Sequence, residues 1–300
     1  MATAAALVGS CIVLFGALPV LLARADWPSR APRAAVILWQ AIGVSGSLGA
    51  IGAGIAIATA PLHTSLPVGT ARMIEGGLGR LNVYEAIGLA LATYIAGGLS
   101  GSFVVTFART LRARGRHRRV LDLVGNRSDL LPGTIVLDHS AAVAYCLPGL
   151  RPRIVLSSGT LRTLEGNEIM AVVEHERGHV HARHDLVMLP LMSLLGPFHW
   201  LPYARLAPAS VATLLEMAAD DYACRSHSRR DVAAALVHLA AAGAGRIPSC
   251  AFSATGSVVT RRVRRLAFED NSRTVGLAAL TAACAVFVLP LVCILGTAAT

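Results

Sequence analysis

One short stretch of the chain carries side chains that could hydrolyse a peptide bond. Residues 173–179 read Val-Glu-His-Glu-Arg-Gly-His, so His175 and His179 are four positions apart and Glu176 follows the first histidine. In a helix, positions four apart lie on one face, where both imidazoles can bind one Zn²⁺ at ~2.0–2.1 Å. The metal would lower the pKa of its bound water toward ~7, and Glu176 would pass a proton from this water to the leaving amine. This spacing predicts the site of a zinc peptidase.

The alternative is a solvated helix face that is merely rich in histidine, because His181, His184 and Asp185 follow at once. A third metal ligand would separate the two interpretations. Metzincins place a glycine three residues, and a histidine six residues, after the second histidine of the motif. Those positions hold Ala182 and Asp185, so the sequence excludes that class.

A second acidic cluster can supply the third ligand. Glu216 and Asp220 are four positions apart in a stretch whose pattern predicts a helix from about Ser210 to Arg225. We expect Glu216 to complete the zinc site, as in gluzincins, and Asp220 to hold a ligand histidine in its orientation. Two carboxylates in an otherwise apolar helix need partners, because an unpaired buried charge is costly. The alternative is an acidic cluster at the exposed end of a helix.

The elements that must position these residues read as a small sheet followed by helices. Hydrophobic residues that alternate with a period of two predict three short strands. From about residue 166 they follow a helical period instead, and this helical segment includes the histidine motif. The second strand could offer an edge to which a substrate adds in extended form, although an ordinary structural edge has the same pattern. The predicted elements are strands 134–138, 141–147 and 153–157 and helices 166–184, 210–225 and 231–242.

The composition places this domain beside a membrane. Hydrophobic residues make up 54% of the 300 residues and charged residues 15%, which excludes a disordered chain and argues against an ordinary soluble protein. Four uncharged stretches are long enough to cross ~30 Å of hydrocarbon. The first has no basic residue ahead of its apolar run, so a retained helix is favoured over a signal peptide. The predicted spans are about residues 1–23, 34–60, 86–108 and 274–300.

Two features refine this picture of four helices. Gly97 and Gly101 give the third span a GxxxG spacing, which favours close helix packing but also occurs on ordinary packing surfaces. The apolar stretch Leu186–Ala204 contains three prolines, so we expect a broken helical hairpin there. The predicted fold class is an α-helical membrane protein with an α+β gluzincin domain, residues 109–273, inserted between the third and fourth transmembrane helices.

The charge distribution predicts the orientation. All 27 basic residues are arginine, against 17 acidic residues, for a net charge of +10. Six arginines lie at residues 109–119 and four at 261–265, at the two ends of the predicted domain. The positive-inside rule then places the N-terminus outside and the domain in the cytoplasm. We expect both groups, the two arginine collars, to lie where the domain meets the membrane, and the collar at 109–119 to contact anionic lipid. No aromatic platform accompanies the collar at 109–119, so we predict no direct contact with nucleic acid.

With these features the chain resembles the BlaR/MecR membrane antirepressor zinc metallopeptidases. The resemblance rests on the four helices, on a gluzincin domain between the third and fourth, and on Pro152–Leu156 ahead of the histidine motif. It implies that Glu176 is catalytic and that the zinc ligands are His175, His179 and Glu216. It further implies a protease that responds to an extracellular signal and acts on a cytoplasmic protein substrate, a DNA-binding repressor of the BlaI type.

The chain departs from the sensor proteins of this family in one respect. Those proteins carry a penicillin-binding domain after the fourth helix, and the 300 residues stop there. We therefore expect a signal to enter through the helices, the loop of residues 61–81 or a separate sensor partner. The alternatives are an HtpX-like quality-control protease, whose pattern His184 would also suit, and a non-proteolytic transducer in which zinc is structural. The sequence predicts neither substrate-binding residues nor the oligomeric state.

Overall fold

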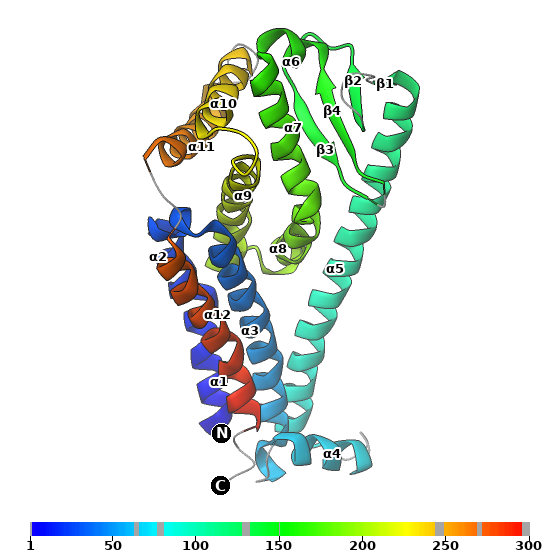
Figure 1. The fold of residues 1–300 in the computed structure, drawn as a ribbon. Coiled ribbons are helices and arrows are strands. Elements are labelled where there is room, and N and C mark those ends of the chain that lie inside the picture. Colours follow the sequence, from blue (N-terminus) through cyan, green and yellow to red (C-terminus); the bar gives the residue numbers. More distant parts are fainter. Residues whose placement is uncertain are drawn as a thin grey trace.

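The structure is a computed structural model that describes residues 2–62, 66–76, 81–127, 133–149, 151–243, 249–268 and 272–295. Met1 and residues 296–300, the outer ends of the first and last predicted spans, lie outside the described residues, as do parts of the loop 61–81. The described part is mostly helical with one small sheet (Figure 1). Four of its helices are long and apolar enough to cross a membrane, which confirms the predicted number of apolar helices.

Three of these four helices lie side by side. The chain begins with a continuous helical rod made of α1, a π-helical segment and α2, and both this rod and α12 pack against α3 (Figure 1). The short helix α4 lies near the start of α1 and the end of α12, at the end of the bundle opposite the sheet. The bounds are α1 (Ala2–Ile12), the π-helical segment (Val13–Ala17), α2 (Leu18–Arg24), α3 (Pro32–Thr59), α4 (Leu66–Gly76) and α12 (Arg273–Leu295).

Helix α5 (Val83–Val124) is longer than a bilayer requires. Its 42 residues span roughly 63 Å at 1.5 Å each, against ~30 Å for the hydrocarbon layer. The predicted third span ends at Ala108, where the arginines begin, but the helix continues because arginine, leucine and alanine are good helix formers. It diverges from α3 and leads to the sheet (Figure 1). The segment 109–124, which composition assigned to the domain, is therefore continuous with the membrane helix.

The four strands form one sheet in the order β1-β2-β4-β3. β2 and β4 are parallel, whereas β1 and β3 pair with them in antiparallel fashion. The three predicted strands are confirmed, and the two-residue β1 is too short to leave a periodic pattern. β3 stands at one edge of the sheet and contacts α7 (Figure 1). The bounds are β1 (Asn126–Arg127), β2 (Thr134–Leu137), β3 (Ala144–Leu147) and β4 (Arg153–Ser157).

Helices α6 to α11 complete the domain. The helix predicted to start near Ser210 begins at Pro202, because the fixed φ of proline suits the first turn of a helix. The broken hairpin is confirmed, since α8 ends at Phe198 and α9 begins four residues later. The bounds are α6 (Ser158–Thr163), α7 (Gly166–His181), α8 (His184–Phe198), α9 (Pro202–Ala223), α10 (Arg229–Gly243) and α11 (Ser249–Phe268).

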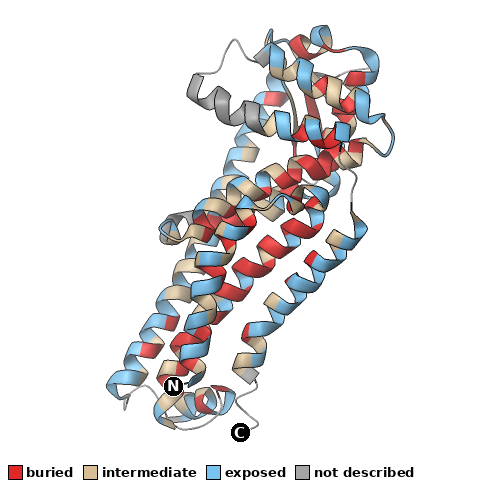
Figure 2. Cartoon of the chain, turned by 90° about the vertical axis from the view of Figure 1, so that its left-hand side faces the viewer, coloured by how far each residue is buried: buried red, intermediate tan, exposed pale blue. Residues whose placement is uncertain are grey.

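Helices α8 and α9 share a hydrophobic core with the membrane helices. Tyr203 is fully buried against Trp39, with ring centroids 6.0 Å apart, and its hydroxyl donates to the Trp39 carbonyl at 2.9 Å. The Gln40 amide donates to the Val187 carbonyl at 2.7 Å. Buried residues run along α3 and through the domain, whereas the other membrane helices expose most of their surface (Figure 2). The domain is therefore packed onto the membrane helices.

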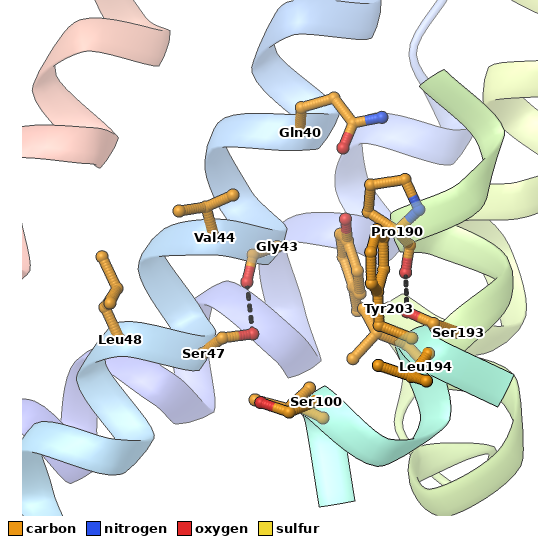
Figure 3. Close-up of a pocket in the computed structure, with 13 residues that line it drawn as sticks. Gln40, Gly43, Val44, Ser47, Leu48, Ser100, Pro190, Ser193, Leu194 and Tyr203 are labelled. Carbon is orange, nitrogen blue, oxygen red and sulfur yellow. Dashed lines mark hydrogen bonds between the residues drawn. The ribbon is translucent and has the colours of Figure 1, made fainter. Parts of the chain in front are cut away.

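A cavity of about 390 Å³ opens between α3, α5 and α8 (Figure 3). Two polar side chains in its wall form hydrogen bonds within their own helices. The Ser47 hydroxyl donates to the Gly43 carbonyl at 2.8 Å, and the Ser193 hydroxyl donates to the Pro190 carbonyl at 2.7 Å. Most of the remaining wall is apolar. The histidine motif does not line this cavity, so it is separate from the predicted zinc site.

Close packing of α3 and α5 depends on two glycines outside the predicted GxxxG pair. A Cβ added to Gly88 would lie 2.4 Å from the backbone nitrogen of Ala58, and one added to Gly54 would lie 2.8 Å from a backbone nitrogen of α5. At Gly97 and Gly101, no described atom lies within 4 Å of such a Cβ. The close approach that the GxxxG spacing favours is therefore made at Gly54 and Gly88 instead.

We predict that Gly88→Ala destabilises the protein by about 1–3 kcal/mol, because its methyl group would collide with the α3 backbone. Gly101→Ala is the matched control, since it makes the same change in the same helix where space is open. Thermal unfolding of the purified protein in detergent should give a lower Tm for Gly88→Ala and an unchanged or higher Tm for Gly101→Ala. Equal midpoints for the two variants would contradict the α3–α5 contact.

Candidate metal centre

Helix α7 carries the histidine motif and lies close to α9. A capping box fixes its start, in which the Glu165 N–H donates to the Glu168 carboxylate at 3.0 Å. Val173 is buried in the core that α7 shares with the sheet. A Cβ added to Gly178 would lie 3.0 Å from the Cβ of Tyr222 on α9. The missing side chain at this glycine lets the two helices approach closely enough to share a site.

The three predicted ligands meet between these helices. Nε2 of His175 and Nε2 of His179 are 3.2 Å apart. The Glu216 carboxylate faces both nitrogens, with Oε2 3.4 Å from Nε2 of His175 and Oε1 3.4 Å from Nε2 of His179. A tetrahedral Zn²⁺ with ligands at ~2.0–2.1 Å requires ligand atoms about 3.3 Å from one another. The spacing of the two nitrogens and the carboxylate therefore suits a zinc ion, which these three residues would hold with a fourth position for water.

Each of these histidines is held through its other ring nitrogen. Nδ1 of His175 lies 3.0 Å from an Asp220 carboxylate oxygen. Nδ1 of His179 lies 2.8 Å from Nδ1 of His184. Because a metal-bound Nε2 carries no proton, each Nδ1 must carry it and donate it to these partners. The geometry thus favours the tautomers that direct both Nε2 atoms to the metal position.

A single backbone turn brings His184 to His179. Helix α7 ends at His181, and Arg183 follows with φ at 50°, in the left-handed region. Among the described residues it is the one non-glycine residue with a positive φ. The turn starts α8 at His184, whose side chain is buried against the preceding helix. The backbone strain at Arg183 therefore coincides with a contact that orients a predicted ligand.

A buried arginine of the second collar completes the site. Arg262 of α11 is only 7% exposed, and it donates to both carboxylate oxygens of Asp220 at 2.8 and 2.7 Å and to Glu216 at 3.0 Å. A bidentate guanidinium–carboxylate pair fixes the orientation of the carboxylate. Arg262 thus holds both a predicted ligand and the partner of His175. The charge of the collar at 261–265 indicated only orientation, so sequence reasoning missed the part that Arg262 has in the site.

Arg265 of the same collar is also buried, and its spacing from Arg262 was a usable signal. It is 4% exposed, binds both carboxylate oxygens of Asp221 at 2.8 Å and donates to the Ser29 carbonyl at 2.6 Å. Two arginines three positions apart share a helix face, and the adjacent acids of α9 required cationic partners. The first collar also contacts the domain, through Arg114–Asp185 at 2.8 Å and Arg118 to the Pro148 carbonyl at 3.0 Å.

The electrostatics of the site favours ionised carboxylates. Burial raises the pKa of Glu216, but its hydrogen bond to His175 and the charge of Arg262 outweigh burial and lower this pKa to about 2. Burial likewise opposes ionisation of Asp220, but hydrogen bonds from Arg262 and His175 hold its pKa well below the usual range. Burial lowers the pKa of His179 to about 4. Burial lowers the pKa of His175, but hydrogen bonds to the carboxylates of Asp220 and Glu216 outweigh burial and raise this pKa to about 9. Binding of a metal to His175 would therefore release a proton.

Glu176 lies buried next to the edge strand. It is 9% exposed, and burial raises its pKa above the usual range. A raised pKa suits a carboxylate that must both accept and release a proton near neutral pH. Burial, together with the nearby Glu176 carboxylate, raises the pKa of the Cys146 thiol of β3 to about 12. The thiol therefore stays protonated, and the edge of the sheet adjoins the predicted general base.

A family model described as BlaR1 peptidase M56 matches residues 82–266 of the chain. The matched segment extends from the start of α5 to near the end of α11, so it includes the histidine motif, Glu216, Asp220 and Arg262. Comparisons with curated proteins and with solved structures found no match.

We predict that Arg262→Met destabilises the protein by about 3–5 kcal/mol, because the buried Asp220 carboxylate loses its cationic partner. Arg264→Met is the matched control, since Arg264 is exposed on the same helix. Thermal unfolding should give a lower Tm for Arg262→Met and a nearly unchanged Tm for Arg264→Met. Adding Asp220→Asn should recover part of the loss, because it removes the unpaired charge. Parent-like stability of Arg262→Met would contradict the buried ion pair.

Proposed function

Because the chain belongs to the BlaR1 peptidase M56 family, we propose that it is an integral-membrane zinc endopeptidase that cleaves a protein substrate. The observation that carries the proposal is the cluster of His175, His179 and Glu216, in which the two Nε2 atoms are 3.2 Å apart and each lies 3.4 Å from one of the two carboxylate oxygens. Structural zinc sites close with four protein ligands, whereas catalytic sites keep one position for water. Three protein ligands beside a buried glutamate therefore favour catalysis over a structural role for zinc.

The side chains around the metal would each have a separate role. A bound zinc ion would lower the pKa of its water toward ~7 and polarise the scissile carbonyl. Glu176 would accept a proton from that water and return it to the leaving amine, which its raised pKa favours. Asp220 and His184 would orient the ligand histidines, and Arg262 would fix the carboxylates of Glu216 and Asp220.

Strand β3 is the proposed edge for substrate binding. It stands at the end of the strand order, next to β4, and its Cys146 contacts Glu176. A substrate that adds to β3 in extended form would bring a peptide bond beside the general base. Its backbone hydrogen bonds would supply affinity without requiring particular side chains, which suits a protein substrate.

We further propose that the domain, residues 109–273, acts in the cytoplasm in regulated signalling, with a repressor of the BlaI type as substrate. The family and the predicted orientation support this proposal, since the two arginine collars lie at the domain end of the bundle. The core that α8 and α9 share with α2 and α3 offers a physical route by which a change in the membrane helices, or in a sensor partner bound to them, could reach the metal centre.

We predict that Glu176→Gln leaves zinc content unchanged and lowers proteolysis by about 10²–10⁴-fold, because it removes the general base but no metal ligand. Glu174→Gln is the matched control, since it makes the same change two positions away, where Glu174 pairs with Arg177. Cleavage of fluorescein-labelled casein and of a purified BlaI-type repressor measures activity, and elemental mass spectrometry measures zinc. His175→Ala should lose zinc and activity together.

Three outcomes would separate the parts of this proposal. Equal cleavage by the parent and Glu176→Gln would reject the peptidase mechanism. Loss of zinc in Glu176→Gln would show that Glu176 is a ligand and not the base. If casein is cleaved but the repressor is not, the peptidase mechanism would stand and the repressor would be rejected as the substrate.

The proposed orientation predicts which positions react with a membrane-impermeant maleimide. In a cysteine-free background, Ile74→Cys on α4, where Ile74 is 77% exposed, should be labelled in intact cells. Leu123→Cys near the end of α5, where Leu123 is 85% exposed, should be labelled only after lysis. The reverse pattern would place the domain outside, and labelling of both positions in intact cells would contradict a membrane-spanning α5.

A further inference from the structure

A second cavity, of about 310 Å³, lies where the domain meets the membrane helices. Its wall is formed by the start of α3, the start of α12, the turn Trp27–Arg30 that precedes α3, and the chain around the end of α9. None of the proposed metal ligands lines it. We call it the arginine cavity, because its wall contains Arg30, Arg33, Arg225 and Arg273.

Within the described residues, the arginine cavity carries positive charge without a matching number of carboxylates. Asp221, the one acidic residue in its described wall, is already paired with Arg265, which binds both carboxylate oxygens at 2.8 Å. Arg225 lies over the ring of Tyr222, at 5.2 Å from the centroid, a contact that uses the flat face of the guanidinium and not its N–H edge. In the described part of the chain, no carboxylate forms a salt bridge with the other three, Arg30, Arg33 and Arg273.

These charges lie where the apolar spans of α3 and α12 begin. Ile37 follows Arg33 by four positions, and Leu277 follows Arg273 by four, so each apolar side chain lies one turn deeper on the same helix face. Ile37 is 49% exposed and Leu277 is 66% exposed. The surface thus changes from cationic to apolar over one helical turn, in the order in which a phospholipid changes from headgroup to acyl chain.

We propose that the arginine cavity binds the phosphate group of an anionic membrane phospholipid whose acyl chains lie along α3 and α12. Guanidinium groups bind phosphate oxygens in pairs, and basic pockets between membrane helices suit lipid headgroups. The phosphate would join the end of α9 to the first turns of α3 and α12. Since Asp221 directly follows Asp220, the partner of His175, the lipid would sit beside the segment that holds the metal centre.

The test uses the full chain in mixed micelles of phosphatidylcholine with increasing phosphatidylglycerol, and native mass spectrometry follows the first bound phosphatidylglycerol. Arg33→Gln/Arg273→Gln removes two charges from the cavity. Arg24→Gln/Arg109→Gln is the matched control, since it removes two exposed arginines at the same end of the bundle outside the cavity. We expect the affinity to fall by on the order of tenfold in the cavity variant and by less than about threefold in the control.

Equal weakening in the two double variants would overturn the proposal, because general surface charge would then explain the binding. Equal affinity of the parent for phosphatidylglycerol and phosphatidylcholine would overturn it as well. Inorganic phosphate at the same concentration should not displace the lipid, and displacement would assign the cavity to free phosphate instead.

Two further variants keep the result interpretable. If the double cavity variant does not fold, the single variant Arg225→Gln provides the test instead. We expect it to weaken phosphatidylglycerol binding several-fold, and unchanged binding would count against the proposal. Glu176→Gln should bind phosphatidylglycerol like the parent, because this inference does not depend on proteolysis. A failure of the lipid site can therefore be distinguished from a failure of the peptidase proposal.

Discussion

The buried ion pair between Arg262 and Asp220 is the interaction on which the proposed metal centre depends. An isolated carboxylate in this position would lose its hydration without compensation, and it would not remain ionised to hold His175. The guanidinium supplies the missing charge and two hydrogen bonds, and its remaining nitrogen aligns Glu216. Because His175, Asp220 and Arg262 come from α7, α9 and α11, one small network ties together three helices that are distant in sequence.

The membrane helices are part of the same scaffold. Gly178 allows α7 and α9 to approach, and α9 in turn begins in the core that contains Trp39 and Tyr203. Arg265 joins α11 to α9 and to the turn before α3. A displacement of α3 relative to α9 would therefore act on the helix that carries Glu216 and Asp220. This coupling through packed elements is what a signal from the membrane would require.

The sequence was informative where chemistry or periodicity is local. The four apolar helices, three strands and the broken hairpin followed from composition, periods and prolines, and the spacing of His175, His179, Glu216 and Asp220 identified residues that the fold brings together. It was not informative where partners are distant in sequence. In the sequence, the arginines at 262 and 265 indicate only orientation, and their role in the site is visible once α11 is placed against α9. Likewise, the glycines that matter for packing can be distinguished from Gly97 and Gly101 only when the place where α3 crosses α5 is known.

In the proposed zinc centre, two imidazoles and one carboxylate hold the ion with one position left for water. X-ray absorption at the zinc edge of the purified full chain tests this arrangement most directly. We expect two imidazole ligands, with all nitrogen and oxygen neighbours at ~2.0–2.1 Å and no sulfur. A third imidazole, which His184 could provide, a sulfur neighbour at ~2.3 Å, or a protein that binds no zinc would contradict it.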